Sequence, residues 1–343
     1  MELPKAVIVG NGILNELPAV LNEVNVDFKN VIILTGPNVF KLIKNQLQLP
    51  SIEEKTLFVH VASFSEINRL KATISRMSNN VTHILGIGGG RVIDIGKMIA
   101  HMLNINFISV PTAPSHDGIA SQFVSIKEMG RVHSFTTTPP YAIIVDVDIV
   151  SKAPKRLIAS GVGDAIAKIV AVRDWKLANE KVGEYYGEYA ANLSLLGAKL
   201  VEKCSEGIGA GDVESIRTLI EALISDGVAA GIAGSSRPCS GSEHLFSHAL
   251  DLYATRHALH GEQVGVGTIL MAYLHGIDFE AIQNTLKKAG APTTYEELNI
   301  PKDDIIKGIL MAKSVRPERY TILNEYNVTA EFAEKIAKKT NVI

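Results

Sequence analysis

The chain has 343 residues, of which 46% are apolar and 20% charged, and its formal net charge is −2. This length predicts about two domains, and the balanced charge excludes a basic surface that attracts nucleic acid. There is no run of about 18 consecutive apolar residues, and the N-terminus lacks a basic segment followed by a long apolar one, so we expect neither a membrane span nor a signal peptide. The two cysteines form no CxxC pair, which indicates a reduced, cytoplasmic protein without a disulfide framework.

Short apolar runs alternate with helical patterns through the first 150 residues. After a short early strand, we predict strands over 31–36, 56–63, 82–90, 106–114 and 141–150, with helical patterns following the first three of these. This alternation predicts right-handed crossovers and a parallel sheet. Between the last two strands, QFVSIKEMGRVHSFTT predicts an antiparallel hairpin that turns at Glu128, Met129 and Gly130.

From about residue 150 onward the apolar residues recur at helical spacing. Ser151 and Pro154 mark a helix start, and we expect Gly161 to end that helix. Further helices are predicted over 164–178, 184–206, 213–232, 241–254, 261–276, 279–289, 302–313 and 329–339. We therefore predict an α/β domain with a parallel sheet over 1–152 and an all-α domain over 153–343.

A glycine loop, GIGGGRVID at 86–94, joins a predicted strand to a predicted helix. Glycines let backbone N–H groups approach a pyrophosphate, and the N-terminus of the following helix favours anions. The loop is not GxGxxG, because Arg91 stands where a third spaced glycine would fall, and no Gly-Lys-Ser/Thr follows as in a P-loop. A phosphate-binding loop and a plain strand-to-helix turn both fit this pattern.

A second loop, PTAPSHDGIAS at 111–121, follows the predicted strand over 106–114 and carries His116 and Asp117. Loops at the carboxyl ends of parallel strands line the ligand crevice of such sheets. We therefore expect this loop to contribute to a binding site.

Four histidines lie within residues 241–263, and two of them, His244 and His248, share one helix face. His260 follows His244 by 16 residues, immediately before a predicted helix. Two histidines and a carboxylate from another element can form a three-ligand metal site with an open position. Asp164, in the first turn of an apolar helix, is the candidate carboxylate, while His257 is expected to be solvated.

For this stretch the sequence excludes one interpretation, a zinc protease, and leaves another open. Glu243 precedes His244 instead of following it, so the HExxH pattern of zinc proteases is absent. A histidine pair with no metal is the remaining alternative.

Four motifs occur in a fixed order along the chain: a GGGxxxD loop, a GxGD helix start, a His-x3-His pair and an HGExVxxG helix start. In this combination the chain resembles the superfamily of iron- or zinc-containing polyol dehydrogenases and dehydroquinate synthase, over essentially its whole length. Three stretches, 111–121, 236–251 and 315–323, are most similar to the sn-glycerol-1-phosphate dehydrogenase family. The resemblance implies a dehydroquinate synthase-like fold, with a dinucleotide-binding N-terminal domain and a helical domain for metal and substrate.

The resemblance also implies residue roles. Three residues match metal ligands, for zinc with iron possible: Asp164, His244 and His260. A further set matches positions that contact NAD or NADP: Gly90, Arg91, Val92, Ile93, Asp94, Thr112, Ala113, Pro114, Ser115 and Ser121. Asp117, Asp164 and His248 match substrate and catalytic positions, His248 or Asp117 being the candidate proton relay, and Arg237 is our candidate for binding a phosphate.

The reaction implied by the resemblance is NAD(P)H-dependent reduction of dihydroxyacetone phosphate to sn-glycerol 1-phosphate, the backbone of archaeal-type membrane phospholipids, by a homo-oligomer. The metal would act as a Lewis acid on the carbonyl oxygen. The alternatives are a glycerol or polyol dehydrogenase, a dehydroquinate-synthase-like lyase and a non-catalytic nucleotide-binding or sensor protein on the same fold; the last is disfavoured because all three candidate ligands are present. The choice between NAD and NADP is open, because no acidic residue follows the predicted strand over 31–36, and Asp-His-His ligands suit zinc or iron.

Overall fold

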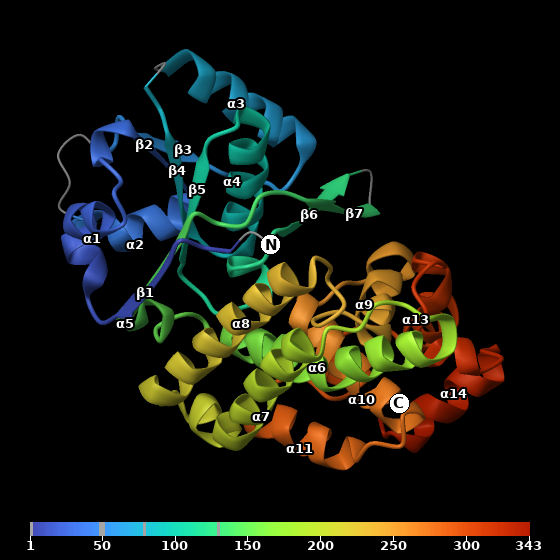
Figure 1. The fold of residues 1–343 in the computed structure, drawn as a ribbon. Coiled ribbons are helices and arrows are strands. Elements are labelled where there is room, and N and C mark those ends of the chain that lie inside the picture. Colours follow the sequence, from blue (N-terminus) through green and yellow to red (C-terminus); the bar gives the residue numbers. More distant parts are fainter. Residues whose placement is uncertain (1–2, 48–51, 78–79, 129–130) are drawn as a thin grey trace. The chain divides into compact units, whose positions relative to one another are not determined.

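The structure is a computed structural model that describes residues 3–47, 52–77, 80–128 and 131–343. The chain folds as two compact units (Figure 1). The first comprises Met1–Pro114 and Gly118–Ala153, and the second comprises Ser115–Asp117 and Pro154–Ile343. Among the described residues, no helix has both the length and the apolar character needed to span a bilayer.

The first unit is built on a six-stranded parallel sheet. Its strands, in the spatial order β1-β8-β5-β4-β2-β3, are β1 (Ala6–Gly10), β8 (Ala142–Asp146), β5 (Asn106–Pro111), β4 (His83–Gly88), β2 (Val31–Thr35) and β3 (Thr56–Phe58). The predicted parallel sheet is thus confirmed. The last strand is shorter than predicted, because Asp146 accepts a hydrogen bond from the backbone N–H of Asp148 and so caps a short helix, α5 (Val147–Val150).

Helices cover both faces of this sheet. Figure 1 shows α1 (Leu17–Glu23) and α2 (Pro37–Leu47) on one side, and α3 (Phe64–Met77) and α4 (Gly90–Leu103) on the other. The alternation along β2 explains the two layers: Val31 and Ile33 join the α1 and α2 core, whereas Ile32 and Leu34 join the α3 and α4 core. A strand that is buried on both faces reads as a continuous apolar run, which is how the sequence VIILT appears.

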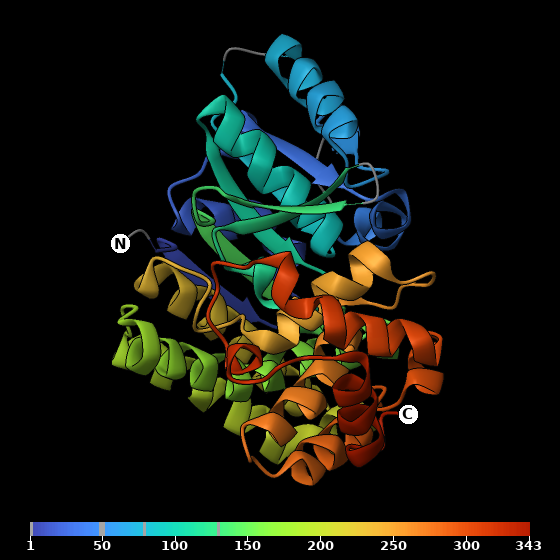
Figure 2. The same cartoon turned by 90° about the vertical axis from the view of Figure 1, so that its right-hand side faces the viewer.

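The predicted hairpin is present beside α4 (Figure 2). It consists of β6 (Phe123–Glu128) and β7 (Arg131–Thr136), paired antiparallel from Phe123 opposite Thr136 to Glu128 opposite Arg131. Val124 and Ile126 pack into the same core as α4. Of the predicted turn residues, Met129 and Gly130 lie outside the described residues.

The second unit is helical, as predicted, and residues 154–343, all of which are described, contain no strand. Its helices are α6 (Lys155–Val182), α7 (Glu188–Ala210), α8 (Val213–Ala233), α9 (Ser242–Tyr253), α10 (His260–Leu274), α11 (Phe279–Lys288), α12 (Tyr295–Leu298), α13 (Lys302–Val315) and α14 (Ala330–Lys339). Short α12 was not predicted.

The prediction that Gly161 ends a helix is wrong, since α6 runs unbroken from Lys155 to Val182. Glycines in this part of α6 serve close packing instead. A Cβ atom on Gly163 would lie 2.0 Å from the carbonyl oxygen of Gly261 in α10, and one on Gly261 would lie 1.9 Å from the carbonyl oxygen of Ser160. The two helix backbones therefore touch where they cross, one residue from Asp164 on α6 and one residue from His260 on α10.

Candidate active site

The glycine loop between β4 and α4 is shaped partly by packing. A Cβ on Gly86 would lie 2.7 Å from the Phe107 ring, and one on Gly88 would lie 2.7 Å from the side chain of Val92. A Cβ on Gly89, by contrast, would meet no atom within 4 Å. Gly86 and Gly88 are thus explained by the core, whereas Gly89 is open, at a helix N-terminus whose first N–H groups lack partners within the helix.

The first turn of α4 carries five of the predicted cofactor residues, Gly90 to Asp94. Val92 and Ile93 are buried, so only their backbone could face a ligand. Asp94 is turned toward the hairpin: its carboxylate accepts a hydrogen bond from the backbone of Ser125 at 3.3 Å and lies 3.4 Å from the Lys97 ammonium. Arg91 is exposed, and its guanidinium lies 3.9 Å from where a Cβ on Gly36 would stand, beside the turn between β2 and α2.

The loop after β5 is held next to the glycine loop. The backbone N–H of Thr112 donates to the carbonyl oxygen of Gly88 at 3.0 Å. Buried Lys97 donates to the carbonyl oxygens of Gly118 at 2.8 Å and Ser121 at 3.1 Å. Of the other predicted cofactor residues here, Ala113 and Pro114 are buried, and Ser115 belongs to the second unit.

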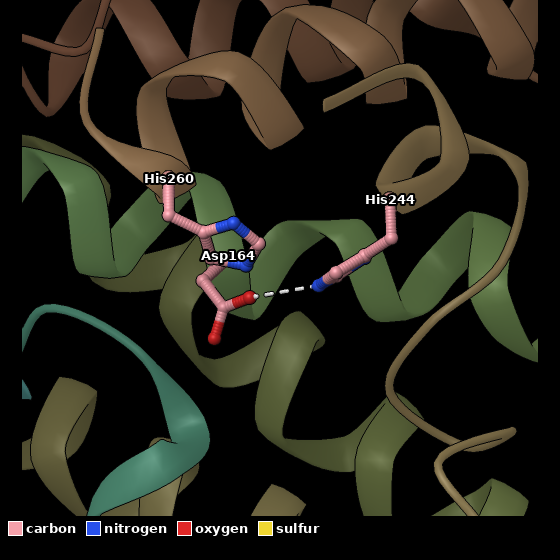
Figure 3. Close-up of side chains that lie close together, drawn as sticks. All are labelled: Asp164, His244 and His260. Atoms are coloured by element: carbon pink, nitrogen blue, oxygen red, sulfur yellow. Dashed lines mark ion pairs between the residues drawn. The ribbon is translucent and has the colours of Figure 1, made fainter. Parts of the chain in front are cut away.

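In the second unit, the side chains of Asp164, His244 and His260 converge (Figure 3). They come from α6, α9 and the first residue of α10, and one potential ligand atom from each lies within 4.8 Å of the other two. Asp164 Oδ1 is buried, 3.4 Å from His244 Nε2 and 3.1 Å from the Lys168 ammonium, and takes part in no hydrogen bond of good geometry. A buried carboxylate that faces two imidazoles fits a divalent metal such as zinc or iron.

Glu243 orients the ring of His244. Its Oε1 lies 2.7 Å from His244 Nδ1 and also accepts a hydrogen bond from the backbone of Gly241 at 2.7 Å. This contact points His244 Nε2 toward Asp164, in the arrangement by which an outer carboxylate fixes a metal-binding histidine. Burial lowers the pKa of His244, but the bonds with Asp164 and Glu243 outweigh it and raise the pKa above its usual value.

Lys168 pairs with two carboxylates in the interior of the unit. Its ammonium is 2.9 Å from Asp117 Oδ2 and 3.1 Å from Asp164 Oδ1, and Asp164 Oδ2 accepts the backbone N–H of Asp117 at 2.8 Å. Burial raises the pKa of Asp164, but Lys168 and His244 outweigh this and hold it well below the usual value. Both Asp164 and Lys168 are therefore charged at neutral pH.

The other two histidines of the stretch differ in environment. Burial, together with the charge of His244, lowers the pKa of His260 to about 3, so its imidazole is neutral at physiological pH. The ring of His248 lies 6.1 Å from that of His260, and His248 Nδ1 is buried without a hydrogen-bond partner. His257 is exposed and lies 4.0 Å from Asp251, apart from the cluster.

Comparison with known proteins extends over the whole chain. The chain is 51% identical over 346 residues to glycerol-1-phosphate dehydrogenase [NAD(P)+] of Metallosphaera sedula, covering 100% of this chain and 98% of the relative. It is 46% identical over 351 residues to the protein of the same name from Pyrococcus horikoshii, covering 100% and 99%. The chain belongs to the glycerol-1-phosphate dehydrogenase family. A model of the iron-containing alcohol dehydrogenases also matches residues 8–154.

Solved structures show that the fold is shared more widely. The structure of glycerol dehydrogenase from Schizosaccharomyces pombe matches with a TM-score of 0.79 at 20% identity, covering 99% of this chain and 90% of that one. NADH-dependent butanol dehydrogenase A from Thermotoga maritima matches with a TM-score of 0.73 at 16% identity, covering 98% and 97%. At these identities the likeness concerns the fold, whereas the glycerol-1-phosphate dehydrogenases are similar in sequence as well.

Within this glycerol-1-phosphate dehydrogenase family member, Arg237 is already engaged by a carboxylate. Its guanidinium forms a bidentate ion pair with Glu184 and donates to the carbonyl oxygen of Tyr320 at 2.9 Å. The carboxylate that neutralises Arg237 lies 53 residues away in the sequence, so the local motif gave no sign of the pairing. The predicted phosphate contact of Arg237 stays a prediction, and this ion pair argues against it.

Sequence reasoning passed over two residues of the cluster. Glu243 entered the sequence interpretation only through the absence of an HExxH motif, although its position next to His244 is a usable signal. Lys168 lies four residues after Asp164, the spacing at which helical side chains meet. That spacing could have suggested the ion pair, but it gave no indication that the lysine would be buried.

Proposed function

We propose that this chain reduces dihydroxyacetone phosphate to sn-glycerol 1-phosphate with NADH or NADPH. The observation that carries the proposal is the cluster of Asp164, His244 and His260, with ligand atoms within 4.8 Å of one another. It occurs in a chain that matches glycerol-1-phosphate dehydrogenases [NAD(P)+] from end to end. The same cluster on an unrelated fold would indicate only a metal site.

We assign cofactor binding to the first unit and metal and substrate binding to the second, with a boundary near residues 152 and 153. The open position at Gly89 and the helix start at Gly90 support backbone contacts to a pyrophosphate. Thr112, hydrogen-bonded to Gly88, supports contacts from the neighbouring loop. Asp164 and Asp117, joined through Lys168, support a substrate-binding role for the second unit.

The residues of the second unit suit carbonyl reduction. When bound, the nicotinamide supplies the hydride, and a zinc or iron ion supplies Lewis acidity toward the carbonyl oxygen. Charged Asp164 and the imidazoles of His244 and His260, which are neutral when they coordinate a metal, would hold a divalent ion with net positive charge left over. His248, whose buried Nδ1 has no hydrogen-bond partner, is our candidate to exchange a proton with the substrate oxygen. Asp117, the alternative, is engaged by Lys168.

Several broader features belong to the same proposal. On α7 the side chains of Tyr189, Leu196 and Leu200 are exposed at helical spacing, Tyr189 to 72%, which supports association of identical copies through this face. Cys204 and Cys239 form no disulfide, in keeping with the reducing cytoplasm. There the product would supply the backbone of archaeal-type membrane phospholipids.

The test is an assay of the purified, zinc-loaded protein with dihydroxyacetone phosphate and either nicotinamide. We expect one reduced nicotinamide to be oxidised per product formed, and the product to be sn-glycerol 1-phosphate when analysed with enantiomer-specific enzymes. Formation of sn-glycerol 3-phosphate would contradict the stereochemical assignment. Faster turnover of glycerol than of glycerol 1-phosphate in the reverse direction would favour a glycerol dehydrogenase. Conversion of a substrate without net nicotinamide oxidation would favour a lyase.

A further inference from the structure

Two arginines that follow α13, Arg316 and Arg319, form no ion pair with a carboxylate of any described residue. Arg319 donates to the carbonyl oxygen of Ser240 at 2.6 Å and to the hydroxyl of Ser236 at 2.8 Å, and both acceptors are neutral. The guanidinium of Arg316 forms no hydrogen bond or ion pair with any described residue. Both side chains are only partly exposed. Arg237 differs from them, because Glu184 neutralises it.

The packing of α13 on α9 places these arginines. Asp304, near the start of α13, accepts hydrogen bonds from the backbone and hydroxyl of Thr255, just beyond the end of α9, at 2.8 and 2.6 Å. Arg319, beyond the end of α13, binds Ser240, just before the start of α9. Between these ties, a Cβ on Gly308 would lie 2.8 Å from the side chain of Leu250, so the helices are in close contact. The two helices are thus antiparallel. Arg316 and Arg319 therefore lie beside the N-terminal half of α9, which carries His244 of the metal cluster.

The charges of the two arginines reach the candidate active site. Arg316 and Arg319 lie near enough to His248 for their charges to act on its ring. Burial, with the charges of Arg316 and Arg237, lowers the pKa of Arg319 to about 10. Two carboxylates, Glu243 and Glu184, raise the pKa of Arg319. Each of them is paired elsewhere, Glu243 with His244 and Glu184 with Arg237. The charge of Glu318 acts in the same sense on Arg316, but Glu318 is exposed and forms no ion pair with it. Among the described residues, neither arginine therefore has a carboxylate in ion-pair contact.

We propose that Arg316 and Arg319 bind the phosphate group of the substrate, with its reacting carbon toward His248 and the metal cluster; this inference rests on the proposed function. Guanidinium groups match phosphate oxygens through paired, charge-assisted hydrogen bonds. A phosphate dianion would neutralise both arginines at once. Arg237 is then a positioning residue, since its bond to the Tyr320 carbonyl holds the backbone next to Arg319.

The test compares a phosphorylated with an unphosphorylated substrate in Arg319→Gln, Arg316→Gln and the conservative Arg319→Lys. The loss of a charge-assisted contact predicts a fall in kcat/KM for dihydroxyacetone phosphate of about 10- to 100-fold in each glutamine variant. The kcat/KM for dihydroxyacetone should change little, and Arg319→Lys should recover part of the loss. Arg217→Gln, which removes an exposed arginine paired with Glu221 on α8, is the matched control and should leave both substrates unaffected.

Binding of inorganic phosphate to the zinc-loaded protein gives a second readout, measured by calorimetry without any turnover. We expect phosphate to bind the wild type and the Arg217 variant, and to bind at least about tenfold more weakly when Arg316 or Arg319 is replaced. Equal losses with both substrates, or unchanged phosphate binding, would overturn the inference. If the wild type bound phosphate through these arginines but failed to reduce dihydroxyacetone phosphate, the proposed function would fail and the phosphate site would stand. Folding of each variant is checked by its zinc content, and Arg316→Gln carries the test if Arg319→Gln fails to fold.

Discussion

The glycine loop of the first unit and the metal cluster of the second are built in opposite ways. In the loop, Gly86 and Gly88 are required by the neighbouring side chains of Phe107 and Val92, and the part that could meet a ligand is backbone. In the cluster, Asp164, His244 and His260 are side chains from three helices, held by the charges of Lys168 and Glu243. The loop thus depends on shape and the cluster on charge. Substitutions in the loop should therefore alter packing or cofactor binding, and substitutions in the cluster should alter electrostatic stability or metal binding.

The largest expected effect is on the cluster, in Lys168→Met. This change leaves buried Asp164 and partly buried Asp117 without their cation, and breaking a buried pair costs about 3–5 kcal/mol. We expect that loss in the free energy of unfolding of the zinc-free protein, measured in urea. Lys181→Met, which removes an exposed partner of Glu325, is the control and should have little effect. Equal stability of the two variants would show that Lys168 does not hold the cluster.

Glu243→Gln should weaken metal binding while leaving the three ligands in place. A glutamine cannot offer His244 Nδ1 a charged acceptor, and loss of such an outer partner lowers metal affinity about 10- to 100-fold. Competition with a chromophoric chelator measures this affinity. An unchanged zinc affinity would mean that the contact at 2.7 Å does not orient the ring.

A matched pair in the loop, Gly86→Ala and Gly89→Ala, separates packing from ligand approach. The added methyl at Gly86 would stand 2.7 Å from the Phe107 ring, and such overpacking costs about 1–3 kcal/mol of stability. At Gly89 the methyl meets no atom within 4 Å, so we expect native stability but weaker NADH and NADPH binding. Chemical denaturation and nicotinamide fluorescence measure the two quantities. Full NADH affinity in the stable Gly89 variant would argue against a cofactor at this turn.

The smallest expected effect is at Arg91, whose guanidinium lies beside the turn at Gly36. In parallel dinucleotide-binding sheets, the turn after a strand lies near the ribose 2′ position, and an arginine there accommodates the 2′-phosphate of NADP. We expect Arg91→Gln to weaken NADPH binding by up to about tenfold, because one charge-assisted contact is lost, and to leave NADH binding unchanged. Equal weakening of both cofactors would place Arg91 at the pyrophosphate instead.

Much of the fold could be predicted because it is encoded locally. The apolar run at Val31–Thr35 and the helical spacing after residue 150 identified the sheet and the helical unit. The prediction that a helix ends at Gly161 was wrong, because a glycine that ends a helix cannot be told in sequence from one that lets two helices touch. The difference lies in Gly261, about 100 residues away, whose carbonyl oxygen occupies the space that a side chain on Gly163 would need.

The same distinction applies to the candidate site. The spacing of His244 and His260 and the GxGD motif at Asp164 were readable, and the structure brings these three residues together. The helix start predicted at Asp164 is wrong, because Asp164 lies inside α6. The charge pairing of Arg237 was not readable, since it depends on a distant partner. The sequence predicts a phosphate contact for Arg237, which is neutralised by Glu184, and predicts no role for Arg319, which forms no ion pair with a carboxylate of any described residue.

The most direct test of the metal site is a zinc titration of the metal-free protein, with bound zinc and reduction of dihydroxyacetone phosphate measured on the same samples. His260→Ala is compared with His257→Ala, because His257 comes from the same stretch but is exposed and outside the cluster. We predict one zinc per chain and activity proportional to zinc in the wild type and in His257→Ala, and loss of both in His260→Ala. A His260→Ala protein that keeps its zinc and its full rate would contradict the assignment of the cluster as the catalytic metal site.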